Sequence, residues 1–257
     1  QIDKPMALLQ QADLAMYRAK QQGRNTYQWY SQEFNVEASY RVALRNQLQE
    51  AIDQRQLSVY YQPLIDARTG QTRNIEALVR WQHPTRGLIP PSDFIPLAEE
   101  TGQIIALGDC VLRMACRDMV QLHSRGFRHC SVSVNVSPIQ LRKEGFTETV
   151  TDILRVSGLP PECLELEVLE SAVLLDTDVV INTLHAIRKL GVHIAIDDFG
   201  TGFSSLSYIK LLPANKIKID RSFIKDVIEN RSDAAITQGV ISMAHHLGLE
   251  VVAEGVE

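Results

Sequence analysis

Residues 193–205 read HIAIDDFGTGFSS, in which a short apolar run ends in two adjacent aspartates and a glycine-rich loop. A short apolar run bounded by turn residues is typical of a buried β-strand, and the serines after it suit the start of a helix. The segment therefore predicts a β-strand that presents Asp197 and Asp198 where it ends. The same order of apolar run, polar residue and amphipathic segment recurs from residue 57 onward.

This alternation predicts parallel strands that are joined by crossover helices. The expected strands are residues 57–66, 73–81, 129–137, 163–170, 193–199, 216–220 and 250–256. The expected helices are residues 91–99, 103–125, 146–157, 178–190, 204–211 and 234–247, several of which end at a glycine. The pattern predicts an α/β protein of the TIM type, a (β/α)8 barrel whose C-terminal unit is missing from the chain.

An open doubly wound sheet would show the same alternation, and polar residues near the strand ends decide between the two folds. The strand ends of a barrel converge on one face, whereas those of an open sheet are spread along a line. Polar residues at these positions favour the barrel; they are Glu76, Asn135, Glu167, Asp197, Asp198 and Glu254, with Lys218 beside the end of another strand.

Five carboxylates at one barrel mouth cannot all remain charged unless cations compensate them. The potential ligands are oxygen atoms, without a cysteine or histidine near these strand ends, so Mg²⁺ or Mn²⁺ is expected. Asp197 and Asp198 suit two ions, which could activate water and assist an in-line phosphoryl displacement. The alternatives are a solvated rim position for any single glutamate and, for Lys218, a rim cation that balances Asp220.

Composition excludes several other classes of protein. The net charge is −5 and no run of Lys and Arg occurs, so direct nucleic-acid binding is not expected. The four cysteines lack metal-site or CxxC spacing, which predicts reduced thiols in a cytoplasmic protein. No apolar run approaches the roughly 20 residues of a membrane span, so no membrane segment is expected in this chain. Any membrane anchor of the parent protein is expected outside this chain, in an upstream segment.

The first 56 residues follow a different pattern. An amphipathic helix at residues 12–22 ends at Gly23, a short strand is expected at residues 25–30, and a polar helix is expected at residues 37–54. This unit has too little apolar surface for a core of its own. We therefore expect the end of another domain, followed by a connecting helix.

Ordered motifs along the chain match one family. Gln62-Pro-Leu is followed by Glu76-Ala-Leu-Val-Arg-Trp, Val134-Asn-Val-Ser, Leu164-Glu-Leu-Glu-Val-Leu-Glu, the Asp197-Asp-Phe-Gly segment, Lys218-Ile-Asp and Ala253-Glu-Gly-Val-Glu. Over residues 40–257 this set resembles the EAL family of cyclic di-GMP phosphodiesterases. Residues 12–20 (ADLAMYRAK) with Gly23-Arg-Asn resemble the C-terminal end of a GGDEF domain. The resemblance implies a GGDEF remnant at residues 1–31, a connecting helix at 32–56 and an EAL barrel at 57–257.

The resemblance also implies an antiparallel first strand and the hydrolysis of cyclic di-GMP to 5′-pGpG with two Mg²⁺ or Mn²⁺ ions. An upstream GGDEF domain would be a partner in the parent chain, and homodimer formation stays open. The alternative is a catalytically weak EAL domain that acts as a cyclic di-GMP receptor or regulates the attached GGDEF domain.

Individual roles follow from the same resemblance. It implies that Glu76, Asn135, Glu167 and Asp197 hold one metal and that Asp198 helps to hold the second. Lys218 and Glu254 would position or activate the water, and Glu254 would also be a metal-binding residue. Glu76, Asp198, Lys218 and Glu254 would be the catalytic residues. Gln62, Arg80 and Pro96 would contact the substrate, Glu170 would steady the loop at residues 200–205, and Glu257 would support the metal site.

Overall fold

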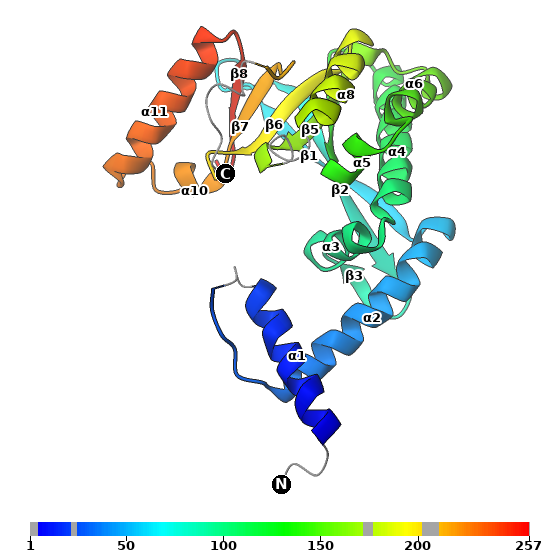
Figure 1. Ribbon diagram of the computed structural model, residues 1–257. Helices are drawn as coiled ribbons and strands as arrows, with labels where there is room; N and C mark the ends of the chain where they lie inside the picture. Colours follow the sequence, from blue (N-terminus) through cyan, green and yellow to red (C-terminus); the bar gives the residue numbers. More distant parts are fainter. Residues whose placement is uncertain (1–4, 22–24, 172–176, 202–210, 257) are drawn as a thin grey trace.

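The central sheet is curled into an open half-barrel (Figure 1). The computed structural model describes residues 5–21, 25–171, 177–201 and 211–256. Its strands follow the order β1-β2-β4-β5-β6-β7-β8, and β3 pairs with β2 outside this path. The strands are β1 (Leu57–Ile65), β2 (Thr72–His83), β3 (Gly87–Ile89), β4 (Ser131–Val136), β5 (Leu164–Leu169), β6 (His193–Phe199), β7 (Lys216–Ile219) and β8 (Glu250–Ala253). All seven predicted strands are confirmed, and so is the α/β class.

Strand direction follows the expectation drawn from the family. β1 pairs with β2 in antiparallel register, and each later neighbouring pair from β2–β4 to β7–β8 is parallel. The short strand β3 was not predicted. It pairs with the far end of β2, which continues beyond its last parallel pair, Ala77 with Val134. Glu76 therefore lies in the middle of β2, not in its later part as expected, although it is at the end of the parallel segment.

Helices cover the outer face of the sheet and leave the inner face to polar residues. The helices are α3 (Pro91–Thr101), α4 (Ile104–Ser124), α5 (Pro138–Arg142), α6 (Phe146–Ser157), α8 (Thr177–Lys189), α10 (Arg221–Ile224) and α11 (Arg231–His246), with a 3-10 turn at Pro161–Cys163. Side chains of a strand alternate between its faces. One set packs with the helices in the main hydrophobic core; it includes Val132, Val134, Leu164, Leu166, Ile194, Ile196 and Ile217. The residues between them face inward.

The N-terminal part consists of two helices, α1 (Pro5–Gln21) and α2 (Gln32–Asp53), which contact each other and diverge below the half-barrel in Figure 1. Leu44 and Leu48 of α2 are buried in a second core with residues of β2 and α3. The predicted strand at residues 25–30 is wrong, because residues 26–30 form no regular element. Tyr27 and Trp29 there are exposed and contact each other edge to face instead of pairing with a strand.

The helices expected at residues 91–99, 103–125, 146–157, 178–190 and 234–247 agree with the observed bounds within three residues. The helices expected at residues 12–22 and 37–54 begin earlier, at Pro5 and Gln32. Ser31 caps α2 by accepting a hydrogen bond from the Glu33 amide. The helix expected at residues 204–211 falls almost wholly outside the described residues. Within the described part of the chain, no helix has the length and apolar character needed to cross a membrane.

Candidate active site

The inner face of the half-barrel carries two successive sets of polar side chains. We call Glu76, Asn135, Glu167, Asp197, Lys218 and Glu254 the mouth layer. Most of its members have a counterpart two residues earlier on the same strand, and these counterparts form what we call the lower layer: Asn74, Ser133, Glu165 and Lys216. Two residues along a strand correspond to about 6.6 Å. The layers therefore stack along the inside of the half-barrel.

Lys218 lies at the centre of the mouth layer. Its Nζ is 2.8 Å from Glu167 Oε2, 3.2 Å from Glu76 Oε2, 3.1 Å from Asp197 Oδ1 and 2.8 Å from Glu254 Oε1. The residue is 2% exposed. Burial disfavours the ammonium, but the carboxylates outweigh it and raise the pKa of Lys218. The lysine is therefore a permanent cation among four carboxylates, not a rim charge paired with Asp220.

Glu167 has one carboxylate oxygen that Lys218 does not satisfy. Its Oε1 is buried and has no hydrogen-bond partner among the described residues. Burial, reinforced by the Glu76 and Asp197 carboxylates, raises the pKa of Glu167 to about 8, although Lys218 opposes this shift. A buried acceptor without a donor is costly. A bound cation would satisfy it.

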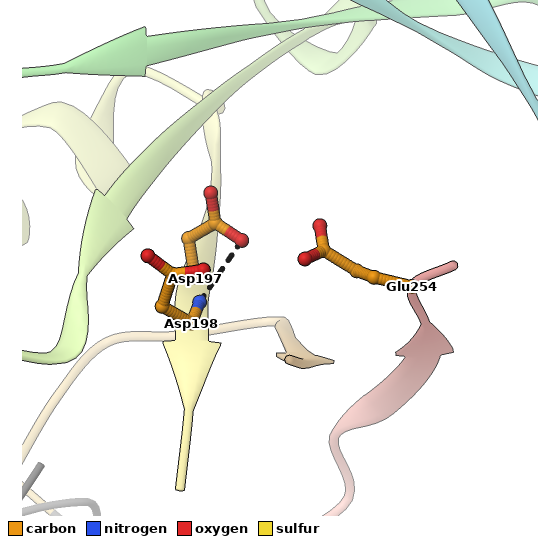
Figure 2. Close-up of side chains that lie close together, drawn as sticks. All are labelled: Asp197, Asp198 and Glu254. Atoms are coloured by element: carbon orange, nitrogen blue, oxygen red, sulfur yellow. Dashed lines mark hydrogen bonds between the residues drawn. The ribbon is translucent and has the colours of Figure 1, made fainter. Parts of the chain in front are cut away.

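Asp197, Asp198 and Glu254 form the only group of three or more His, Cys, Asp or Glu side chains in the described ranges whose ligand atoms lie within 4.8 Å of one another. Figure 2 shows the Asp197 and Glu254 carboxylates facing each other from β6 and the end of β8. The β6–β7 register shifts between Ile196 and Phe199, and Asp198 has a left-handed φ of 54°. Consecutive residues of a regular strand point to opposite faces, so this irregularity lets both aspartates serve one site.

Hydrogen bonds fix the aspartate pair and the amide of the mouth layer. The Asp198 backbone N–H donates to Asp197 Oδ1 at 3.0 Å. Burial and the nearby Asp197 and Asp220 raise the pKa of Asp198. Asn135 Nδ2 donates to Glu76 Oε1 at 2.9 Å, which orients the amide toward the carboxylates. The site thus offers carboxylate and amide oxygens, the donor set that Mg²⁺ and Mn²⁺ prefer.

The turn after β6 is held in place by Glu170. The Gly200 backbone N–H donates to Glu170 Oε2 at 2.7 Å. Gly200 has a φ of 102°, and a Cβ there would approach Phe223 within 2.8 Å, so the position requires glycine. Residues 202–205 of the predicted loop and Glu257 lie outside the described residues.

Of the predicted substrate contacts, only Gln62 is paired directly with a residue of the mouth layer. Gln62 of β1 is paired with Glu76 of β2 and is exposed. Arg80 lies with its guanidinium 5.5 Å from the Tyr60 ring centroid. Pro96 is an exposed residue inside α3. The structure thus brings the predicted metal and water residues together, whereas the roles of Gln62, Arg80 and Pro96 stay predictions.

Most of the lower layer was missed from the sequence. Glu165 was expected to point into the barrel below the site, which is confirmed, but Lys216, Ser133 and Asn74 were not singled out. The signal that could have found them is the period-two spacing. Each of them precedes a mouth-layer residue by two positions, as in the Lys216-Ile-Lys218 segment.

Comparisons with known proteins agree with this geometry. The family model described as EAL domain matches residues 45–257. The chain is 43% identical to the bifunctional diguanylate cyclase/cyclic di-GMP phosphodiesterase MucR of Pseudomonas aeruginosa over 97% of this chain and 36% of that protein. It is 44% identical to the cyclic di-GMP phosphodiesterase NbdA of the same bacterium, over 97% of this chain and 32% of that protein.

A solved structure of a close relative has the same fold. The MucR phosphodiesterase in complex with cyclic di-GMP has a TM-score of 0.80 and 43% identity, over 84% of this chain and 87% of that chain. The chain spans about a third of the length of the curated relatives it matches.

Proposed function

This chain belongs to the EAL domain family, and on that premise we propose that it hydrolyses cyclic di-GMP to linear 5′-pGpG with two divalent metal ions. One observation carries the proposal: the buried Glu167 Oε1, which has no hydrogen-bond partner among the described residues, lies in the mouth layer with the Asp197 and Glu254 carboxylates. In a purely structural salt-bridge cluster, a buried acceptor is expected to have a hydrogen-bond donor. The relatives named as cyclic di-GMP phosphodiesterases supply the substrate class.

The chain's residues divide into two metal-binding sets. Glu76, Asn135, Glu167 and Asp197 would hold the first ion, and Asp198, with Glu254 nearby, would hold the second. Mg²⁺ or Mn²⁺ bound there would lower the pKa of a ligated water and offset the charge of the phosphodiester. The fixed Asp198 backbone and the Asn135–Glu76 hydrogen bond keep these ligands in place before any ion arrives.

Lys218 and Glu254 would handle the attacking water. Lys218 donates to Glu254 Oε1, so the two side chains form a fixed pair of donor and acceptor at the mouth. Burial raises the pKa of Glu254, which suits a group that takes a proton from water. The water oxygen forms a new bond to phosphorus and the bond from phosphorus to the ribose 3′ oxygen breaks. The proton balance leaves a 5′-phosphate and a 3′-hydroxyl on the linear product.

Other residues would bind the dinucleotide or support the site. Gln62 and Pro96 would contact the substrate, and the Arg80 guanidinium would pair with a phosphate. Glu170 would hold the turn at Gly200, and Glu257 would support the metal ligands.

A hydrolysis assay tests the proposal. The purified chain should convert cyclic di-GMP to 5′-pGpG with Mg²⁺ or Mn²⁺, and this hydrolysis should stop when a chelator is added. Glu76→Ala should abolish turnover without loss of the fold, because it removes a ligand but little core volume. Glu162→Ala is the matched control, since this exposed glutamate precedes β5 at the opposite end of the strand. Turnover that persists in Glu76→Ala, or in the presence of chelator, would contradict the assignment.

A second role, regulation of a neighbouring domain, is favoured by contacts of the N-terminal helices. Arg41 of α2 donates to Tyr17 of α1 and to Glu100 of α3, and Tyr17 also donates to Glu100. Helix α3 carries Pro96, the proposed substrate contact, so displacement of α1 would change the position of this substrate-binding residue. We infer that residues 1–31 end a GGDEF domain of the parent protein, in line with the diguanylate cyclase in the name of MucR. Arg41→Ala should change turnover in the parent protein, where that domain is attached, but should leave turnover of the isolated chain unchanged.

A receptor without turnover is the remaining alternative. It would bind cyclic di-GMP with the affinity of an enzyme but would show no hydrolysis with either metal. Calorimetric binding measured beside the hydrolysis assay separates the two.

A further inference from the structure

A buried ion pair lies directly below the mouth layer and takes no part in the proposed reaction. Lys216 Nζ is 2.8 Å and 2.7 Å from the two carboxylate oxygens of Glu165. Ser133 Oγ and Asn74 Nδ2 donate to Glu165 Oε1 at 2.8 Å and 3.1 Å. All four side chains are buried. The Lys216 charge is therefore compensated within the lower layer.

The strand register places Lys216 within reach of the mouth layer as well. Glu167 of β5 pairs with Ala195 of β6, and Ala195 in turn pairs with Lys216 of β7. The backbone of Lys216 is thus level with Glu167. Glu165 lies two residues earlier, about 6.6 Å along the strand. The lysine side chain turns back by two residues to Glu165, with the same offset that brings Lys218 to Glu167.

Ala195 allows this crossing from β7 to β5. It is completely buried but belongs to neither hydrophobic core, as expected for a residue on the inner face. At this level of the sheet, the methyl group of Ala195 is the β6 side chain that lies between Glu167 and Lys216. A larger side chain would stand between Lys216 and the carboxylates of β5.

Glu167 Oε1 is the acceptor that an unpaired Lys216 would reach. This oxygen is buried and has no partner among the described residues, while the other oxygen already binds Lys218. We propose that Glu165 is a positioning residue for metal binding: it retains the Lys216 ammonium in the lower layer and so keeps Glu167 Oε1 open to a divalent cation. This inference rests on the proposed two-metal function.

Three variants separate this role from a contribution to stability alone. Glu165→Gln keeps the shape of the side chain but removes its charge, so the Lys216 ammonium should turn to Glu167 and compete with the metal. Lys216→Met removes the ammonium at similar volume and should leave metal binding intact. The double variant Glu165→Gln/Lys216→Met has no stray cation and should recover the affinity that the single Glu165→Gln variant loses.

The test is a titration with Mn²⁺, followed by electron paramagnetic resonance and by calorimetry, on the wild-type chain and the three variants, with circular dichroism as the check of folding. We expect binding to weaken about tenfold or more in Glu165→Gln and to return to within about threefold of wild type in the double variant. Wild-type affinity in Glu165→Gln, or a double variant as weak as the single one, would overturn the inference.

If Glu165→Gln does not fold, Lys216→Met decides. Affinity equal to or above wild type supports the inference, and a loss beyond about threefold overturns it. A wild-type chain that binds no Mn²⁺ would overturn the proposed function itself, which distinguishes that failure from failure of the positioning role.

Discussion

Replacing Lys218 with methionine should make the stability of the fold depend on metal. The ammonium contacts four carboxylates at 2.8–3.2 Å and is 2% exposed. Each contact corresponds to about 4 kcal/mol or more of Coulomb attraction at an effective dielectric constant near 20, before desolvation is subtracted. Removing one partner from a buried ionic group typically costs about 3–5 kcal/mol. In a domain of this size that predicts a fall in Tm of about 6–20 °C without metal.

Divalent cations should reverse most of this loss, because they compensate the same carboxylates. The assay is thermal unfolding followed by circular dichroism, with chelator and with saturating Mg²⁺, and hydrolysis measured in parallel. Lys225→Met, a change at an exposed lysine after α10, is the control. We expect Mg²⁺ to raise the Tm of Lys218→Met more than that of wild type, while turnover stays low because the water-positioning donor is gone. An equal Tm deficit with and without Mg²⁺ would refute the argument that metal and lysine share these ligands.

Three further outcomes are expected. Asp198→Asn, which keeps a residue type that tolerates the left-handed φ of 54°, should retain the wild-type Tm but bind Mn²⁺ at least about tenfold more weakly in a calorimetric titration; equal affinity would exclude it as a ligand. Gly200→Ala should lower the free energy of unfolding by about 1–3 kcal/mol, measured in urea, because of its positive φ and the Phe223 contact; an unchanged midpoint would show that the turn rearranges freely. Burial, with a smaller effect of Arg86, lowers the pKa of His83, whose Nδ1 accepts from the Thr85 amide. Since the unfolded chain then binds the proton more readily, stability should fall as pH drops below about 6.5, and this dependence should be smaller in His83→Gln.

Strand β6 shows how much the sequence could predict. Its bounds were predicted without error, because an apolar run, two aspartates and a glycine mark both ends. The same reasoning placed Glu167 and Lys218 on two parallel strands that flank β6. Direction, order and pairing then bring these side chains together without any further information.

Other features depended on contacts that local sequence does not encode. Residues 25–30 have the aromatic composition of a strand, yet a strand exists only where a partner edge is available. The extension of β2 is stabilised by β3, a three-residue strand too short to produce a periodic signal. Lys218 was expected among the carboxylates, but its simultaneous contact with four of them was not, because these partners come from four other segments of the chain.

The charges of the mouth explain why this arrangement is suited to two divalent ions. Glu76, Glu167, Asp197, Asp198 and Glu254 provide five carboxylates, against the single ammonium of Lys218. Four negative charges would stay uncompensated, the charge that two divalent cations carry. Burial raises the pKa values of Glu167, Asp198 and Glu254, which makes protons competitors of the metal at these carboxylates. The Lys216 ammonium would be a further competitor, and its ion pair with Glu165 holds it in the lower layer. The lower layer therefore keeps a second fixed cation away from a site whose remaining charges must stay exchangeable.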